Sequence, residues 1–430
     1  MPCKIMERVI AQQMYSYFNT NRILHKAQHG FVKGHSTCTN LLESMNDWTL
    51  SINDKRGVTV VYIDFRRAFD SVSHRKLIEA RLASYGIAGN LLDWLRNYLS
   101  GRTHQTKIGT AKSVFAKLIS GVIQGSGVGP LMFLSYINEL IEIMERYEVK
   151  IKLFADDAKV YAEIVDFCDV EMLQRALDSL AEWAALWQLE IAINKCFVLN
   201  MGKFPKSISL SSIHYCIDNC VLPVVESCRD LGVIVSCDSS FREHINGIVL
   251  RAQQRTCMIL KCFISKDTDV LLRSYFTYVR PILEFNAVVW SPVLKCEIDA
   301  LECVQRRFTK RLRGMDNLSY ADRLAKLELF TLELRRLHID LVMCYKIVFG
   351  LVELQFSDFF SLSPSEATRG HQYKLYKTRG DGARNNFFCN RIINVWNNLP
   401  TDTVDFTSLC SFKRSIKQAD FSDYLKASMS

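Results

Sequence analysis

Three aspartates stand where they could bind divalent cations. Asp64 ends an apolar, β-branched run of the chain, and Asp156 and Asp157 directly follow the apolar residues Leu153, Phe154 and Ala155. Carboxylates at neighbouring strand ends repel one another unless a cation binds between them, and Mg²⁺ uses one or two carboxylates together with substrate phosphate oxygens. Two such ions about 3.5–4 Å apart can hold the attacking and leaving oxygens of a phosphoryl transfer. The alternative is that Asp156 and Asp157 merely form a hairpin turn, a position that aspartate favours.

A second group of charged residues could contact a polyanion. Five basic residues with no acid among them fall within a predicted helix that also contains Phe308, namely Arg306, Arg307, Lys310, Arg311 and Arg313. Lysine and arginine contacts to phosphate groups supply most of the affinity for nucleic acid. The alternative is a solvated helix face, which such runs of charge commonly form.

The elements that must position the acids form a recognisable order. Residues 58–65 predict a buried strand, residues 150–164 predict a strand, an acidic turn and a second strand, and residues 190–200 predict a fourth strand. The segments between them predict helices 74–85, 91–99, 131–147 and 170–188, and a hairpin of 105–108 with 114–119. The order β–α–β–β–α–β, with an insertion after the first strand, predicts an α+β fold of the split-βαβ, ferredoxin-like type. Its adjacent strands would bring Asp64 and Asp156 together.

The rest of the chain reads as mostly helical. Residues up to 51 predict a helix, a Gly- and Lys-rich loop and a second helix. Beyond residue 231 the 3.6-residue periodicity predicts helices 241–263, 297–313, 319–326 and 332–349. A shift towards Lys, Pro and Ser at 202–212 predicts a domain boundary.

Composition limits the class of protein. The 430 residues are 49% hydrophobic and 23% charged, which excludes a disordered chain and predicts two to four packed domains. The net charge of +9 is compatible with a polyanionic partner. The fifteen cysteines include no CxxC pair, so a zinc ribbon or knuckle is unsupported, and they predict reduced, mostly buried thiols in an intracellular protein.

One uncharged run is long enough to suggest a membrane span. Residues 118–137 carry no charge. Four glycines and Pro130 crowd the first part of the run, and these residues make a poor helix. The pattern instead predicts a glycine-rich loop that opens a helix near Gly129 and Pro130, so we expect no membrane partner.

Several motifs together resemble those of a known family. VVYIDFRRAFDSVSH, GVIQGSGVGPLMF, LFADDAKVY and RDLGVIVSCDSSFREHI occur in the order of the palm motifs of reverse transcriptases. Further segments (QHGFVKGHSTCTNLL, SYFTYVRPILEFNAVVWSP, RIINVWNNLP) resemble LINE-type (non-LTR) retrotransposons of the Jockey-like branch. The resemblance implies a right-hand polymerase, with partial fingers at 1–56, a palm at 57–204 and a primer-grip-like connection at 205–240. A helical thumb-like region at 241–350 and a C-terminal region of unknown role at 351–430 would follow.

The resemblance also implies roles for individual residues. Asp64 and Asp156 would hold two Mg²⁺ ions, which Mn²⁺ can replace, with Asp157 as a less direct third acid. Lys195 would protonate the leaving pyrophosphate, although a solvated surface lysine is the alternative. The incoming nucleotide would be contacted by the backbone of Phe65, Arg66, Arg67 and Ala68, by the steric gate Phe69, and by Gln124 and Gly125. The template or the triphosphate would be contacted by Lys33 and His35.

Three hypotheses follow for function. The first is an RNA-directed DNA polymerase that acts on an RNA template, a DNA primer and deoxynucleoside triphosphates. The second is an inactive relic that keeps the fold and nucleic-acid binding, and the third is a non-catalytic helical nucleic-acid-binding module. Because the chain starts at what resembles the middle of a fingers segment, with no endonuclease constellation, we expect an N-terminally truncated element protein. Its location would be nuclear, cytoplasmic or both.

Overall fold

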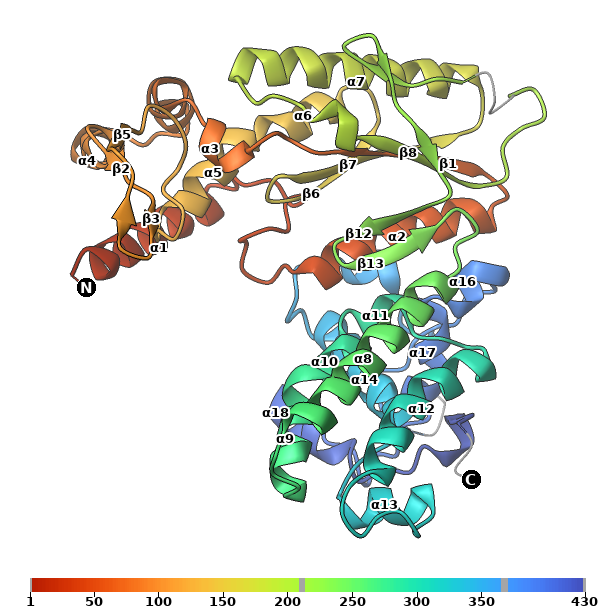
Figure 1. Cartoon of the computed structure of the whole chain (residues 1–430). Coiled ribbons are helices and arrows are strands. Elements are labelled where there is room, and N and C mark those ends of the chain that lie inside the picture. The colour runs from red at the N-terminus through yellow and green to blue at the C-terminus, as the bar shows by residue number, and fades with distance from the viewer. Residues whose placement is uncertain (1, 209–212, 365–369, 428–430) are drawn as a thin grey trace. The chain divides into compact units, whose positions relative to one another are not determined.

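The computed structural model describes residues 2–208, 213–364 and 370–427 (Figure 1). The chain divides into two compact units. The sheet unit comprises Met1–Asn40 and Arg56–Glu226, and the helical unit comprises Leu41–Lys55 and Ser227–Ser430. Part of the predicted boundary at 202–212 lies outside the described residues, because 209–212 are not among them.

The sheet unit is built on a five-stranded sheet. Its strands are β1 (Gly57–Ile63), β6 (Lys150–Phe154), β7 (Asp157–Ile164), β8 (Phe197–Gly202) and β11 (Val224–Val225), in the order β11-β8-β1-β7-β6. β1 pairs antiparallel with both β7 and β8, and β6 pairs antiparallel with β7. The order of the four longer strands is the one that the β–α–β–β–α–β pattern predicts, and it places the ends of β1 and of the β6–β7 hairpin side by side.

Helices and short strands complete the sheet unit. They are α1 (Pro2–Thr20), α3 (Ala68–Ser71), the π-helical segment η1 (Lys76–Leu82), α4 (Gly89–Leu99), α5 (Gly129–Ile137), α6 (Glu139–Glu145), α7 (Phe167–Trp187) and a 3₁₀ turn η2 (Ile193–Lys195). The short strands are β2 (Thr103–His104), β3 (Lys107–Ile108), β4 (Ala111–Lys112), β5 (Ala116–Lys117), β9 (Cys216–Ile217) and β10 (Cys220–Val221). A capping box of Asp166 and Asp169 fixes the start of α7, because each side chain accepts a backbone N–H of the other residue.

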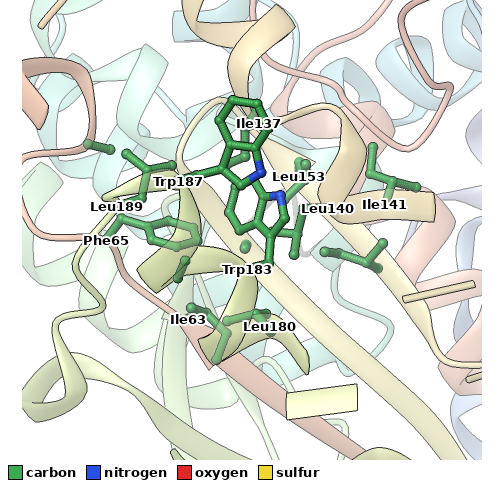
Figure 2. Close-up of a cluster of buried hydrophobic side chains, with 14 of the residues drawn as sticks. Ile63, Phe65, Ile137, Leu140, Ile141, Leu153, Leu180, Trp183, Trp187 and Leu189 are labelled. Carbon is green, nitrogen blue, oxygen red and sulfur yellow. The ribbon is translucent and has the colours of Figure 1, made fainter. Parts of the chain in front are cut away.

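The core of the sheet unit lies between the sheet and the helices α5, α6 and α7. Figure 2 shows Trp183 and Trp187 of α7 among aliphatic side chains, close to Phe65, which follows β1. The ring centroids of Phe65 and Trp183 lie 6.4 Å apart in an edge-on arrangement. Burial of such large aromatic surfaces makes the end of β1 rigid, since interiors are closely packed.

The helical unit contains α2 (Thr37–Asn53) from residue 41 onwards and most of the C-terminal half of the chain. Its other elements are β12 (Ser227–Asp230), β13 (Val233–Ser236), α8 (Arg242–Cys262), α9 (Thr268–Tyr278), α10 (Arg280–Glu284), α11 (Ala287–Trp290), α12 (Lys295–Lys310), α13 (Tyr320–Lys326), α14 (Leu332–Val348), α15 (Phe356–Phe359), α16 (Gly382–Asn386), α17 (Phe388–Asn397), α18 (Leu409–Ser415) and η4 (Ser422–Tyr424). The predicted helices 241–263, 319–326 and 332–349 are confirmed to within a few residues.

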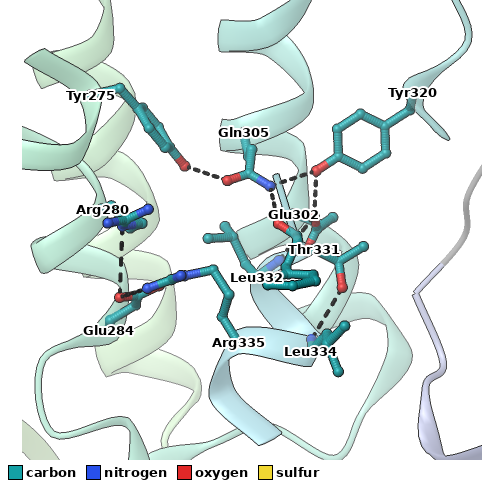
Figure 3. Close-up of polar contacts among 11 residues, drawn as sticks. Tyr275, Arg280, Glu284, Glu302, Gln305, Tyr320, Thr331, Leu332, Leu334 and Arg335 are labelled. Atoms are coloured by element: carbon teal, nitrogen blue, oxygen red, sulfur yellow. Dashed lines mark hydrogen bonds and ion pairs between the residues drawn. The ribbon is translucent and has the colours of Figure 1, made fainter. Parts of the chain in front are cut away.

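A buried polar network ties α12 to the helices around it (Figure 3). The carboxylate of Glu302 accepts the hydroxyl hydrogen of Tyr320 and, at 2.9 Å, the backbone N–H of Leu332, the first residue of α14. Gln305 accepts a hydrogen bond from the Tyr275 hydroxyl and donates one to the Tyr320 oxygen, each at 3.1 Å. Burial raises the pKa of Glu302, while the Tyr320 hydroxyl and the Leu332 N–H oppose this shift. This network fixes the helix that carries the predicted basic cluster.

Five sequence predictions need correction. Predicted helix 131–147 is interrupted at Asn138, whose side chain bonds to the backbone of Ile23 and His25. The fourth strand starts at Phe197 because the 3₁₀ turn precedes it. The hairpin 105–119 is two short ladders, β2 with β5 and β3 with β4.

The fourth correction concerns α12, which ends at Lys310, so Arg311 and Arg313 lie beyond the helix. The prediction of mostly buried thiols is the fifth that is wrong: none of the fifteen cysteines, all of them among the described residues, forms a disulfide, but eight are exposed. Gly129 and Pro130 do open a helix, α5, as predicted.

No helix within the described ranges has both the length and the apolar character that crossing a bilayer requires.

Candidate functional site

Asp64 lies one residue beyond the end of β1. The chain stays extended there, because Phe65 forms a bridge with Ile191 and the Asp64 carbonyl accepts the N–H of Ala192 at 2.8 Å. The backbone of Asp64 is therefore held on one side by the segment that leads into η2. Its carboxylate is only partly covered, with 37% of the side chain exposed, so the oxygens remain accessible to a ligand.

Asp156 and Asp157 lie where the β6–β7 hairpin reverses. Phe154 pairs with Asp157, so Ala155 and Asp156 form a two-residue turn, and Asp157 is the exposed first residue of β7. Ala155 has a φ of 58°, in the left-handed region that residues other than glycine seldom adopt. Since Ile63 pairs with Ala158, the next position along β1 brings Asp64 beside the tip of this hairpin.

The carboxylates of Asp64 and Asp156 are close enough to influence each other. Burial raises the pKa of Asp156 above the usual value, and the charge of Asp64 raises it further. The N–H of Asp156 and the ammonium of Lys195 act in the opposite direction. The Lys195 Nζ lies 3.1 Å from Asp64 Oδ1, at the end of η2. The fold thus brings together three of the four predicted catalytic side chains, which come from three separate segments.

The donor set fits a hard divalent cation. Asp64 and Asp156 offer carboxylate oxygens of the kind that Mg²⁺ prefers, and the mutual repulsion of the two acids is what a bound cation would relieve. Within the part of the chain that the structure describes, no group of three or more His, Cys, Asp or Glu side chains could hold a metal ion. Two carboxylates alone leave most of the coordination sphere to water and to phosphate oxygens of a substrate.

The residues that follow Asp64 turn sharply away from the sheet. Phe65 and Ala68 are buried, whereas Arg66 and Arg67 are exposed. The N–H of Arg66 donates to the Glu190 carbonyl at 2.7 Å, so this one of the four predicted triphosphate contacts is already occupied. Arg67 has a φ of 49°, and the next residue begins α3. The turn leaves the guanidinium of Arg67 in solvent.

Phe69 is fixed by two other rings. Its ring stacks on that of the buried Phe133, with centroids 4.1 Å apart and planes 19° apart. The ring of Phe31 meets Phe69 edge-on at 6.2 Å. A half-buried aromatic ring held in this way can act as a rigid wall, because a change of rotamer would break both contacts.

The glycine-rich loop is bound to the turn that follows Asp64. Gln124 donates a hydrogen bond of 3.0 Å to the Asp70 carboxylate, and Val122 donates its N–H to the Phe69 carbonyl at 2.8 Å. A Cβ at Gly121 would come within 2.8 Å of the Asp70 backbone, so this close approach requires glycine. Gly125 has a φ of +79° with open space around its Cα, so conformation alone calls for glycine there.

Asp70 and His74 position this loop. The Asp70 carboxylate binds Gln124, and His74 Nε2 lies 2.7 Å from the Gly121 carbonyl. Neither residue was among the predicted site residues. Their partners lie about fifty positions away in the chain, and no local pattern reveals such a contact.

The predicted nucleic-acid contacts have different environments. Lys33 is exposed, while His35 is half-buried, with its Nδ1 3.0 Å from that of His29. In the helical unit, Arg306 lies over the Tyr320 ring at 5.0 Å, so it has a packing role. The three residues Arg307, Lys310 and Arg311 are exposed, as is Arg313.

A pocket of about 630 Å³ lies beside Arg311 and Arg313. Lys261 and Lys266, on and just after the C-terminal end of α8, also line it, with apolar side chains such as Leu260 and Leu271. Among the described residues that line this pocket none is acidic, so it has the charge that attracts phosphate groups. Lys261 and Lys266 were not among the predicted site residues because they lie at and just after the end of α8, far from the basic cluster along the chain.

Comparison with known proteins decides the family. A sequence model of the reverse transcriptases (RNA-dependent DNA polymerases) matches residues 1–235, more than half of the chain. The chain belongs to the reverse transcriptase family. The matched region contains Asp64, Asp156 and Lys195.

Curated relatives identify the branch of the family. The chain is 25% identical over 323 residues to the probable RNA-directed DNA polymerase from transposon BS of Drosophila melanogaster, and 23% identical over 326 residues to that from the mobile element jockey of Drosophila funebris. These matches cover 71% and 72% of this chain and 34% of each relative. The resemblance to Jockey-like reverse transcriptases is confirmed, and the chain spans about a third of the length of these relatives.

Among solved structures, the chain is similar to a Candida tropicalis telomerase in complex with a TWJ fragment of telomeric RNA. The TM-score is 0.43 at 10% identity, over 96% of this chain and 56% of that one. The family assignment rests on the sequence comparisons alone.

Proposed function

We propose that this protein is an RNA-directed DNA polymerase that adds deoxynucleotides to the 3′ end of a primer. The observation that carries the proposal is the juxtaposition of Asp64 and Asp156 at neighbouring strand ends, where the charge of Asp64 raises the pKa of Asp156. Membership of the reverse transcriptase family supports the reaction class. Hydrolases and other phosphoryl-transfer enzymes also use paired acids, so the carboxylates by themselves would not select a polymerase.

In the proposed reaction the primer 3′-oxygen attacks the α-phosphorus of a deoxynucleoside triphosphate, and the bond to pyrophosphate breaks. Bound Mg²⁺ would neutralise charge between the two acids and on the phosphate oxygens. Asp64 and Asp156 would hold the cations, and Asp157 would contribute a further negative charge near the hairpin tip. Lys195 is within reach of Asp64 and could give its proton to the departing pyrophosphate.

The residues around the acids would select the nucleotide. We propose that the backbone of Phe65, Arg67 and Ala68 faces the triphosphate, with the exposed Arg66 and Arg67 guanidinium groups nearby. The fixed ring of Phe69 would exclude a ribose 2′-hydroxyl by steric contact. Gln124, held by Asp70, and Gly125 would contact the base or sugar.

We further propose that the split-βαβ sheet is the palm of a right-hand polymerase. The segments before β1 would then belong to partial fingers, and the helices from α8 onwards would form a thumb-like region. In that region the pocket lined by Lys261, Lys266 and Arg311 is the part best suited to the phosphates of an RNA template or a DNA primer. Lys33 would be a further contact in the fingers.

A primer-extension assay tests the proposal. Purified protein with a poly(rA) template, an oligo(dT) primer, Mg²⁺ and labelled dTTP should incorporate label. Asp156→Asn should lower incorporation by at least about 100-fold, whereas the control Asp93→Asn, at an exposed acid on α4, should not change it. Template binding without incorporation would support an inactive relic instead, and loss of both from a folded protein would contradict the proposal.

A further inference from the structure

The segment that precedes Lys33 runs alongside the acidic hairpin. Gln28 forms a parallel bridge with Leu153 of β6. The N–H of His29 donates to the Leu153 carbonyl at 2.8 Å, and the N–H of Leu153 donates to the Ala27 carbonyl at 2.9 Å. The side-chain amide of Asn40 donates to the same Leu153 carbonyl at 3.0 Å. Residues 27–29 therefore pair with the edge strand β6 next to the turn that contains Asp156.

The carboxamide of Gln28 continues this pairing around the turn. Its Oε1 accepts the N–H of Ala155 at 2.8 Å and that of Gly30 at 2.7 Å. Its Nε2 donates to the Ala155 carbonyl at 3.2 Å. One side chain thus holds both polar groups of a residue whose φ is 58°. Gln28 is only 2% exposed, so losing it would leave the Ala155 N–H buried without a partner.

The backbone of Gly30 packs directly against the backbone of the Ala155–Asp156 turn. A Cβ at this position would lie 2.2 Å from the nitrogen of Ala155 and 2.9 Å from the carbonyl carbon of Phe154. These are backbone atoms, which cannot rotate away as a flexible side chain can. Any larger residue at position 30 must displace the turn.

From these contacts we infer that Gln28 and Gly30 are positioning residues for Asp156: they lock the Ala155–Asp156 turn so that its carboxylate shares divalent cations with Asp64. The left-handed conformation is unfavourable for alanine and persists only where its surroundings determine it. The Gln28 carboxamide supplies that constraint at the place where two acids repel each other. The inference rests on the proposed function for the purpose of the turn, but the locking itself is independent of catalysis.

Gln174 offers a matched control in the same unit. Its carboxamide also pairs with one backbone residue, because Nε2 donates to the Cys216 carbonyl at 3.0 Å and Oε1 accepts the N–H of Cys216 at 3.0 Å. Gln28→Met and Gln174→Met each replace a carboxamide with a neutral side chain of similar length. Only the first change affects the turn that carries Asp156. Gly30→Ala is the second variant that should displace this turn, through steric overlap rather than loss of hydrogen bonds.

Three measurements on the full chain separate the possible results. Amide hydrogen exchange should be faster at residues 153–158 in Gln28→Met and unchanged there in Gln174→Met. The dissociation constant for Mn²⁺, read from its electron paramagnetic resonance signal, should rise about tenfold in Gln28→Met and Gly30→Ala. In primer extension, half-saturation by Mg²⁺ should rise similarly, while the KM for dTTP at saturating Mg²⁺ should change less than about threefold.

Other results would overturn the inference. Unchanged exchange and Mn²⁺ affinity in Gln28→Met, or an equal change in Gln174→Met, would show that the carboxamide does not position the turn. If the wild-type protein binds Mn²⁺ but incorporates no nucleotide, the proposed function fails, and the exchange and Mn²⁺ results still decide the role of Gln28. If Gln28→Met does not fold, Gly30→Ala carries the same test.

Discussion

The Lys195 ammonium lies 3.1 Å from Asp64 Oδ1, so one candidate metal ligand is paired with a cation of the chain itself. The Lys195 side chain is 60% exposed, and such ion pairs contribute little to folding. A cation that binds the Asp64 carboxylate could displace Lys195 with little loss of folding free energy. The pair is therefore better placed to serve a reaction than to hold the fold together.

We expect Lys195→Met to separate these two roles. The free energy of unfolding should change by less than about 1 kcal/mol, because the ion pair is largely in water. Incorporation in the primer-extension assay should fall by about 10- to 100-fold if the ammonium protonates pyrophosphate, with Lys195→Arg losing less. Urea unfolding and single-nucleotide turnover measure the two quantities. Unchanged turnover would show that Lys195 is a solvated surface lysine.

Removing the charge of Asp156 should stabilise the protein in the absence of divalent cations. Since the folded state raises the pKa of Asp156, its carboxylate is disfavoured in the folded state, and stability falls as the pH rises from the unfolded pKa through the folded one. Asparagine cannot ionise, so Asp156→Asn should unfold about 1–4 °C higher than the wild type at pH 7 in EDTA. The difference should shrink as the pH falls through the usual aspartate range.

The same pair of proteins should respond differently to metal. Added Mg²⁺ or Mn²⁺ should raise the unfolding temperature of the wild type, because a ligand that binds only the folded state stabilises it, and should raise that of Asp156→Asn much less. Differential scanning fluorimetry with and without each cation measures the effect. Equal shifts in both proteins would place metal binding elsewhere.

Replacing Phe69 should relax the choice of sugar. In Phe69→Val the wall that stacks on Phe133 is lost, so incorporation of rUTP relative to dTTP should rise by about 10- to 100-fold. Phe31→Val removes the edge-on neighbour of Phe69 but leaves the ring itself. It should relax selectivity less. A ratio that does not change in Phe69→Val would mean that this ring is only part of the core.

Charge reversal at the basic pocket should weaken nucleic-acid binding. Lys261→Glu and Arg311→Glu each remove a cation from the lining, so the affinity for a labelled RNA should fall, and the slope of log K against log salt should decrease by about 1. Lys295→Glu is the matched control, because this exposed lysine lies at the opposite end of α12 from Lys310. Equal losses in all three variants would indicate a general effect of net charge.

The network around Glu302 should be a source of stability in the helical unit. Tyr320→Phe removes the hydroxyl that donates to the buried carboxylate and accepts from Gln305, so the free energy of unfolding should decrease by about 1–3 kcal/mol. Tyr278→Phe alters a 54% exposed ring and should have little effect. Urea titration followed by tryptophan fluorescence compares the two. A loss of equal size in both variants would rule out the network as its cause.

The sequence by itself determined the order of the four longer strands, the positions of the acids beside them and the family. The β-branched run 58–63 is a local signal of a strand, and Asp64 directly follows it, so the sequence alone placed this acid at a strand end. The ends of helices and strands were predicted less well, because the 3₁₀ turn before β8 and the end of α12 depend on partners elsewhere in the chain.

Only the tertiary structure showed which side chains contact and position the acids and the loops around them. Lys195 meets Asp64, Gln124 meets Asp70 and Gln28 meets Ala155 across long stretches of sequence, and Gln28 was not among the predicted site residues. Hydrogen bonds between distant segments leave no periodicity in either one. They form when β1 pairs with both β7 and β8 and when Gly30 approaches the turn, and these arrangements exist only once the chain has packed.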